Sequence, residues 1–226
     1  MDRPSAGHRD RVWSRLEAEF TTTLIELLNF TAMTQLDEID AGLRVVDREI
    51  WVVTAADGQR RGGLVATWVT AASIDRERPM LLAALGANHF TTELVQAGKA
   101  FGAHLLRPDQ IDLAWNFARD SGRQRDKLAG LAVEQHVTGT PVLVDCLARF
   151  DCRVFARYDA GDRLLFWGDV VAADGRRSLP TTCALREQEF FAKLTETQRQ
   201  QLKADRDRDA AAGQPLHDAW RLKKPW

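Results

Sequence analysis

Residues 62–94 read GGLVATWVTAASIDRERPMLLAALGANHFTTEL, and this stretch carries the strongest indication of the fold. It contains two apolar, strand-like segments, and each ends in a cluster of small and hydroxyl-bearing residues. The first cluster is ATWVTAAS at residues 66–73, and the second is GANHFTT at residues 86–92. The pattern predicts two strands that each present a cluster to a ligand.

The second cluster also lies at the start of an expected helix over Thr91 to Gly98. The region from Asn88 to Thr91 would cap this helix and Gly98 would stop it. Capping accounts for one polar residue, but it leaves the preceding Gly-Ala-Asn-His run unexplained. Small residues allow close approach to a flat ligand, and hydroxyls and helix-terminal N–H groups can hold a phosphate. We therefore expect a mononucleotide site, with FMN as its occupant.

The overall composition is that of an ordinary globular protein. The chain has 226 residues, of which 45% are hydrophobic and 28% charged, enough for one domain with extensions. A net charge of −1 gives no general attraction to nucleic acid or acidic membranes, so neither is an expected partner. No apolar run approaches the ~20 residues needed to span a bilayer, and the polar N-terminus lacks a signal peptide's apolar centre. We expect a soluble, cytoplasmic protein.

The residue types that form metal and catalytic centres follow no familiar spacing. The histidines are scattered and the cysteines form no C-x-x-C, so no metal site is expected. Cys146 and Cys152 lie at even spacing in a strand-like pattern, which favours a place in the core. No nucleophile triad or carboxylate pair is recognisable, and we assign no catalytic side chain.

The remaining chain alternates between strand and helix patterns. The period-two alternation places Val144, Cys146, Ala148, Phe150, Cys152 and Val154 on one strand face, with Asp145, Arg149, Asp151 and Arg153 on the other. The expected elements are helix 10–30, strand 43–54 with a hairpin at Asp57-Gly58, strands 62–73, 80–85 and 101–106, helix 109–118, an exposed loop 119–127 carrying Arg123, Arg125 and Lys127, a hairpin within 141–173, and a polar helix 185–208.

These elements predict a mainly β protein, an antiparallel barrel with helical extensions at both ends. The expected organisation is an N-terminal helical extension at 1–42, the barrel domain at 43–175, and a C-terminal helix and tail at 176–226. The tail up to Trp226 either wraps the surface or is loosely ordered, and the sequence leaves both open.

Five segments in order resemble the flavin reductase-like family of FMN-binding split-barrel proteins, over roughly residues 45–175. They are GGLVATWVTAASID, LGANHFTTEL, PDQIDLAWNFA, TGTPVLVDCLARFDCRV and AGDRLLFWGDV. The resemblance implies an antiparallel Greek-key split barrel and a homodimer with the flavin near the subunit interface. It also implies an NAD(P)H-dependent flavin reductase that uses FMN or FAD, with NAD(P)H as co-substrate. A monooxygenase or another electron acceptor would then be a partner.

The resemblance also implies which residues bind the cofactor. Flavin contacts fall on Thr67, Trp68, Val69, Thr70, Ala72 and Ser73 in the first cluster. Residues near the phosphate are Asn88, His89, Phe90 and Thr91 in the second. Trp68 has a second interpretation, because an alternating strand could equally place its side chain in the core.

Two departures from the family pattern bear on function. The usual Asp-Pro-Pro turn is replaced by the longer segment from Asp75 to Pro79, and the common Gly-Asp-His motif reads Gly161-Asp162-Arg163. Arginine keeps a positive charge but is no acid–base group near neutral pH. Arg163 is therefore a candidate substrate-side residue that could steer a nicotinamide phosphate. Two alternatives stay open: an FMN flavoprotein that receives electrons from a partner, and a non-enzymatic binding protein on the same barrel.

Overall fold

The computed structural model describes residues 34–175 and 183–223. The chain divides into two units, residues 1–47 and 48–226. In the first unit, residues 34–44 form a helix, and the helix expected at 10–30 lies outside the described residues. In the described part of the chain, no helix combines the length and apolar character needed to cross a membrane.

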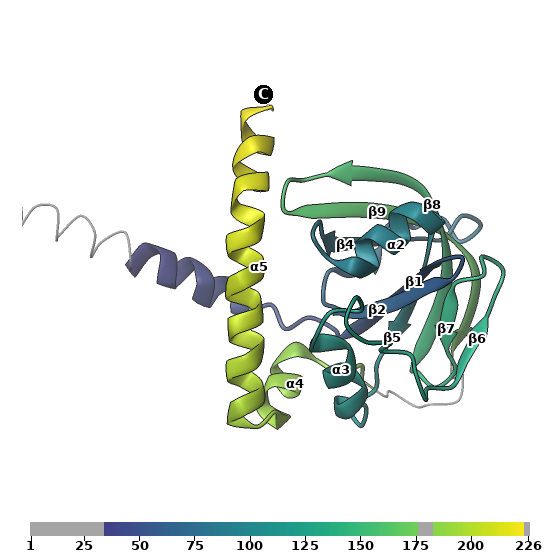
Figure 1. Ribbon diagram of the computed structural model, residues 1–226, viewed down its shortest axis with the longest axis horizontal. Helices are drawn as coiled ribbons and strands as arrows, with labels where there is room; N and C mark the ends of the chain where they lie inside the picture. Colours follow the sequence, from purple (N-terminus) through teal and green to yellow (C-terminus); the bar gives the residue numbers. More distant parts are fainter. Residues whose placement is uncertain (1–33, 176–182, 224–226) are drawn as a thin grey trace, which may run out of the picture. The chain divides into compact units, whose positions relative to one another are not determined.

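The second unit is built on a curled, antiparallel sheet of seven strands, ordered β2-β1-β5-β8-β9-β4-β3 (Figure 1). This confirms the mainly β barrel predicted from the sequence. The seven strands are β1 (Trp51–Asp57), β2 (Arg60–Ala66), β3 (Val69–Ala71), β4 (Met80–Gly86), β5 (Ala100–Leu105), β8 (Ala148–Asp159) and β9 (Arg163–Gly175). A separate two-stranded sheet contains β6 (Val133–Gln135) and β7 (Pro141–Leu143). The helices of this unit are α2 (Phe90–Gly98), α3 (Ile111–Ala118), α4 (Glu187–Lys193) and α5 (Glu196–Leu222).

The hairpin predicted at Asp57-Gly58 joins β1 to β2, and Gly58 adopts the positive φ of 84° that such a tight turn requires. The single strand expected over residues 62–73 is wrong. That segment divides into β2 and β3, which pair with β1 and β4 at opposite ends of the strand order. A straight strand cannot belong to both edges of one sheet, so the chain bends at Thr67-Trp68.

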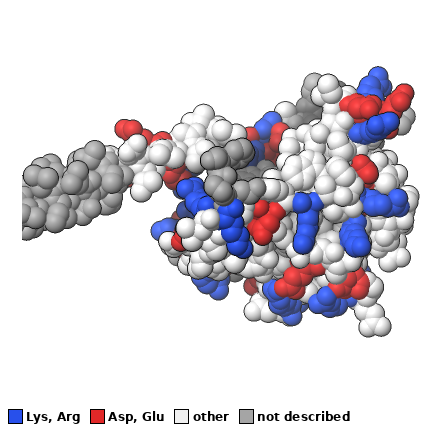
Figure 2. Space-filling view, turned by 90° about the horizontal axis from the view of Figure 1, so that it is seen from above, with Lys and Arg blue, Asp and Glu red and all other residues white. Residues whose placement is uncertain are grey.

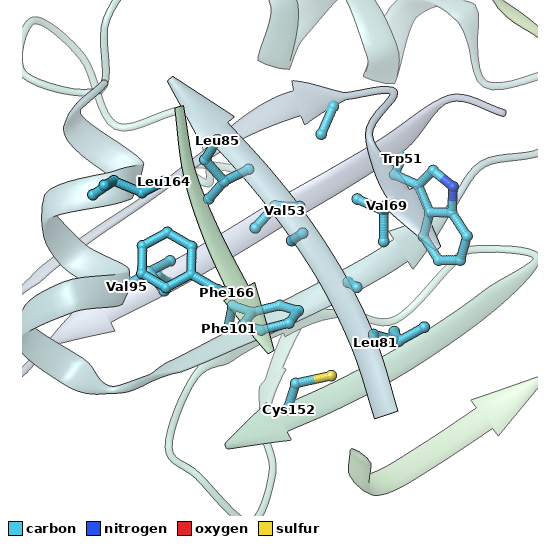
Figure 3. Close-up of a cluster of buried hydrophobic side chains, with 14 of the residues drawn as sticks. Trp51, Val53, Val69, Leu81, Leu85, Val95, Phe101, Cys152, Leu164 and Phe166 are labelled. Atoms are coloured by element: carbon cyan, nitrogen blue, oxygen red, sulfur yellow. The ribbon is translucent and has the colours of Figure 1, made fainter. Parts of the chain in front are cut away.

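β1 is buried on both faces, and each face contributes to a separate apolar cluster that stabilises the unit. Trp51, Val53 and Ala55 point into the curled sheet, where they join Phe101 and Phe166 (Figure 3). The alternate residues Ile50 and Val52 belong to a second cluster that includes side chains from α3 and α4. This period-two alternation follows from the pleat of a strand.

β8 departs from the alternation expected for residues 144–154. The strand begins only at Ala148, so Val144 lies outside it and is exposed, contrary to the prediction. Asp151, expected on the polar face, is fully buried. The pairing of β8 with β5 is unbroken here, so Asp151 faces away from Cys152, and the segment that carries Thr138 buries it. The buried carboxylate accepts hydrogen bonds from the backbone N–H (2.8 Å) and hydroxyl of Thr138.

The C-terminal region is two helices rather than the single helix expected over 185–208. A capping box, in which Thr195 and Gln198 bond reciprocally, starts α5 and separates it from α4. α5 then continues to Leu222 and includes Pro215. Most of the tail left undecided by the sequence is therefore helical.

The loop expected to be exposed at 119–127 is tied to α3. Lys127 is only 4% exposed, and its ammonium group donates to the carbonyl of Phe117 in the last turn of α3 (2.8 Å). Burial, aided by the charge of Arg125, lowers the pKa of Lys127 to about 8. The expectation of a solvated lysine is thus wrong, because this residue satisfies a helix-terminal carbonyl.

The three cysteines should differ sharply in reactivity. Cys146 and Cys152 are buried, as predicted, and Cys183 is exposed. Burial raises the pKa of Cys146 to about 12 and raises that of Cys152 as well, which removes their reactive thiolates. We expect the folded protein at pH 8 to show one fast-reacting thiol in a colorimetric thiol assay. Cys183→Ser should abolish that fast phase, and a fast phase of more than one thiol would contradict the burial described here.

Candidate functional site

The pairing of β4 with β9 brings together two motifs that lie far apart in the sequence. Gly86, which opens the second cluster, is the register partner of Arg163. The next backbone N–H, that of Ala87, donates to the carbonyl of Asp162 (2.9 Å). The loop of residues 86–89 and the turn of residues 160–163 therefore form one continuous surface at this end of the sheet.

Backbone and hydroxyl bonds hold the loop against the start of α2. The N–H of His89 and the hydroxyl of Thr92 both donate to the carbonyl of Gly86, at 3.1 and 2.7 Å. The first N–H groups of α2, those of Phe90 and Thr91, have no acceptor within the helix by helical geometry. They lie where the helix dipole favours an anion.

The expected helix caps are partly wrong. The N-cap is His89, and no side chain bonds to the helix terminus there. At the other end, Lys99 rather than Gly98 adopts the left-handed conformation, with φ of 52°. Gly98 is required for a different reason, because a Cβ at this position would lie 2.1 Å from the carbonyl oxygen of Ala56.

Arg163 lies beside the loop, where its guanidinium contacts an aromatic ring and a carboxylate. Its guanidinium carbon is 5.1 Å from the ring centroid of Trp68, a cation–π contact. Its Nε is buried and has no hydrogen-bond partner among the described residues, but it forms an ion pair with the Asp162 carboxylate at 3.4 Å. A Cβ on Gly86 would lie 3.1 Å from the Arg163 guanidinium and 2.9 Å from the His89 ring. A larger residue at position 86 would crowd both side chains, so glycine there allows Arg163 and His89 to lie over the loop.

Residues 69–71 of the first cluster form β3, an edge strand. The carbonyl of Trp68 and the N–H of Ala72 bond to β4, each at 2.9 Å. Alternation along the ladder then directs the backbone groups of Val69 and Ala71 to the open edge. The Trp68 side chain is 48% exposed, which excludes the core interpretation.

The other residues predicted to bind the flavin differ in their exposure and in their contacts. Thr67 and Ala72 are half-buried, Thr70 is exposed, and the side chain of Val69 faces the core. The hydroxyl of Ser73 accepts from the N–H of Asp75 (3.0 Å), so it stabilises the turn after β3. Thr91 is 3% exposed at the first turn of α2.

Phe90 contacts residues of β2 and of the loop at 119–127. Its ring lies between the guanidinium groups of Arg60 and Arg123, at 5.8 and 5.5 Å from the centroid. A Cβ on Gly62 or Gly122 would approach the same ring to 3.2 or 2.7 Å. Phe90 therefore attaches α2 to β2 and to the loop at 119–127.

One residue at this site, Asp209 of α5, follows from no sequence pattern. Its carboxylate accepts from His89 Nε2 (2.8 Å) and from the amide nitrogen of Asn88 (3.4 Å). Asp209 is 120 positions from His89 and lies in a helix with many similar charges, so no spacing pattern identifies it.

The charges near the site belong to individual side chains and not to a large patch of one sign. On the face shown in Figure 2, basic and acidic side chains are intermingled, with no patch of one sign. In the described residues, no group of three or more His, Cys, Asp or Glu side chains is arranged to hold a metal ion. The site therefore offers a few positioned donors, a guanidinium nitrogen with no hydrogen bond in the described residues, and an exposed indole.

Comparison with known proteins identifies the family of this chain. The flavin reductase like domain model matches residues 43–192. Actinorhodin polyketide dimerase of Streptomyces coelicolor is 33% identical over 121 residues, 53% of this chain and 65% of the relative. An FMN-binding protein of Thermus thermophilus, solved with bound 1-cyclohex-2-enone, is 26% identical with a TM-score of 0.55. That alignment covers 59% of this chain and 73% of the other.

Other relatives are much longer proteins. Diflavin flavoprotein A 1 of Synechocystis is 24% identical over 149 residues, which cover 65% of this chain and 26% of the relative. The chain spans about a quarter of the length of the diflavin flavoproteins it matches. The likeness thus concerns the domain that contains the sheet and its site. This chain belongs to the flavin reductase-like family.

Proposed function

We propose that the protein is an FMN-binding oxidoreductase that works as an NAD(P)H-dependent flavin reductase. The observation that carries the proposal is the meeting of the loop 86–89, the first turn of α2, Arg163 and Trp68 beside the open edge of β3. Family membership supports a flavin as the ligand. We also propose a homodimer, with a monooxygenase or another electron acceptor as partner.

The residues present fit a flavin mononucleotide. The backbone groups of Val69 and Ala71 would bond to the polar edge of the flavin ring, and Trp68 offers an exposed aromatic face next to it. The N–H groups at the start of α2, with Asn88 and His89, would bind the phosphate. The buried Nε of Arg163, which lacks a hydrogen-bond partner in the described residues, is a donor that an anionic group could satisfy.

The chemistry requires little of the protein beyond this binding. When bound, the flavin supplies the redox chemistry by accepting a hydride from the reduced nicotinamide. Arg163 would orient the nicotinamide nucleotide through its phosphate, and the small residues around Gly86 would permit close stacking. Because arginine stays charged, Arg163 acts by attraction and not by proton transfer.

The first experiment is the visible spectrum of the purified protein with FMN, before and after anaerobic addition of NADH or NADPH. Rapid loss of the flavin absorbance near 450 nm, a wavelength typical of oxidised flavin, is the expected result, roughly 10-fold or more faster than FMN alone. Arg163→Ala should raise the KM for the nicotinamide about 10-fold. The matched control is Arg157→Ala, an exposed arginine on β8 that should leave KM unchanged. Equal KM values in both variants would remove Arg163 from nicotinamide binding.

A second candidate is an FMN flavoprotein that receives electrons from a partner. Arg163 favours it, because the guanidinium packed on Trp68 stands where the family's histidine is common. A spectrum that shows bound flavin but stays oxidised with both nicotinamides would select this candidate. Failure to bind FMN or FAD would instead favour a non-enzymatic role.

A further inference from the structure

α5 lies outside the region matched by the family model, yet it contacts the phosphate end of the proposed site. The match ends at residue 192 and α5 begins at Glu196. It also approaches the turn between β8 and β9 closely. A Cβ on Gly213 would lie 2.9 Å from the Asp162 side chain, and a Cβ on Gly161 would lie 2.8 Å from the backbone of His217. α5, the yellow helix of Figure 1, is thus closely packed against the turn that carries Arg163.

The helix brings a carboxylate to the two loop residues expected to bind a phosphate. One oxygen of Asp209 accepts from His89 and the other from Asn88. A carboxylate and a phosphate are both anionic acceptors, and they would use the same donors. Asp209 therefore stands in for a ligand's phosphate on the side chains of this loop.

The contact is weak enough to be displaced. Along α5 the only buried residue is Gly213, so docking removes little apolar surface from water. The side chains of His89 and Asp209 are 29% and 41% exposed, and ion pairs in such positions contribute little. Leu202 packs against the second apolar cluster, which anchors the N-terminal half of α5 independently of Asp209.

We propose that α5 is a self-inhibitory segment, in which Asp209 competes with the phosphate of the flavin for Asn88 and His89. This inference rests on the proposed flavin-binding function and adds a regulation to the same site. It predicts that the competition concerns the phosphate alone. FMN and riboflavin, which differ only by that phosphate, are therefore the discriminating pair of probes.

The test measures the dissociation constants of FMN and riboflavin for the full-length protein and four variants. Asp209→Asn removes the competing charge and should tighten FMN binding roughly 3- to 10-fold, with riboflavin unchanged. Gly213→Leu introduces a strong helix former whose side chain would push α5 from Asp162, and it should have the same effect. The matched controls are Asp207→Asn and Ala211→Leu, at exposed positions of the same helix, and both should behave as the wild type.

The outcomes separate this inference from the function on which it rests. FMN binding that is unchanged or weakened in Asp209→Asn would overturn the competition while leaving flavin binding in place. An equal gain for riboflavin would also overturn it, because the phosphate would then not be the competing group. If neither the wild type nor any variant binds FMN or riboflavin, the proposed function fails and this inference fails with it.

Discussion

Phe101→Ala is expected to lower the free energy of unfolding by about 3–5 kcal/mol, the usual range for a fully buried phenylalanine. Phe101 on β5 is 0% exposed and lies within the apolar cluster inside the curled sheet (Figure 3). β9 approaches its ring so closely that a Cβ on Gly168 would lie 2.7 Å from it. The side chain thus fills the space between two strands, and its removal would leave a cavity in addition to the lost apolar contact.

Chemical denaturation followed by circular dichroism measures the loss. The control is Phe155→Ala, since Phe155 on β8 is 56% exposed and should change the unfolding free energy far less. Should the Phe101 variant prove too unstable to purify, Phe101→Leu retains most of the volume and should show a smaller decrease. Similar losses in the Phe101→Ala and Phe155→Ala variants would contradict the burial of Phe101.

His104 is expected to make the protein acid-sensitive, with a loss on the order of 3 kcal/mol between about pH 6.5 and pH 4. The fully buried ring bonds to the carbonyl of Val52 through Nδ1 (2.9 Å) and to the N–H of Leu143 through Nε2 (3.0 Å). A carbonyl can only accept and an N–H can only donate, so Nδ1 carries the proton and Nε2 is unprotonated. Protonation of Nε2 would break the bond to Leu143 and leave a buried charge.

Burial accordingly lowers the pKa of His104 to about 4. The unfolded chain, with an ordinary pKa near 6.5, binds more protons than the folded one in this window. The stabilising contribution is therefore complete above about pH 6.5 and is lost as the pH falls toward 4.

The measurement is urea unfolding at several pH values between 4 and 7.5, compared with His104→Gln. Glutamine offers one donor and one acceptor without titrating, so the variant should show a shallower pH dependence whatever its absolute stability. Buried carboxylates and other histidines contribute to both proteins equally, and the difference between the two slopes isolates His104. Identical slopes would refute the assignment.

The sequence by itself determined much of the β architecture, because alternation of apolar residues reports directly which face of a strand is buried. It predicted the hairpin at Asp57-Gly58 and the burial of Cys152, both of which depend on neighbours within a few residues. It also placed Asn88 and His89 at the start of a helix, where they are found. These properties depend on residues close together in the sequence, through the periodicity of side chains and the preferences of turn residues.

Only the tertiary structure decided which distant residues share a site. The register of β4 against β9 puts Arg163 beside Gly86, and the docking of α5 puts Asp209 on His89. The segment that carries Thr138 covers Asp151 and buries it, although the pleat turns this side chain away from the apolar cluster. Strand order, register shifts and helix docking depend on the packing of the whole chain. Periodicity along the sequence contains information about the burial of a face, but none about which partner covers it.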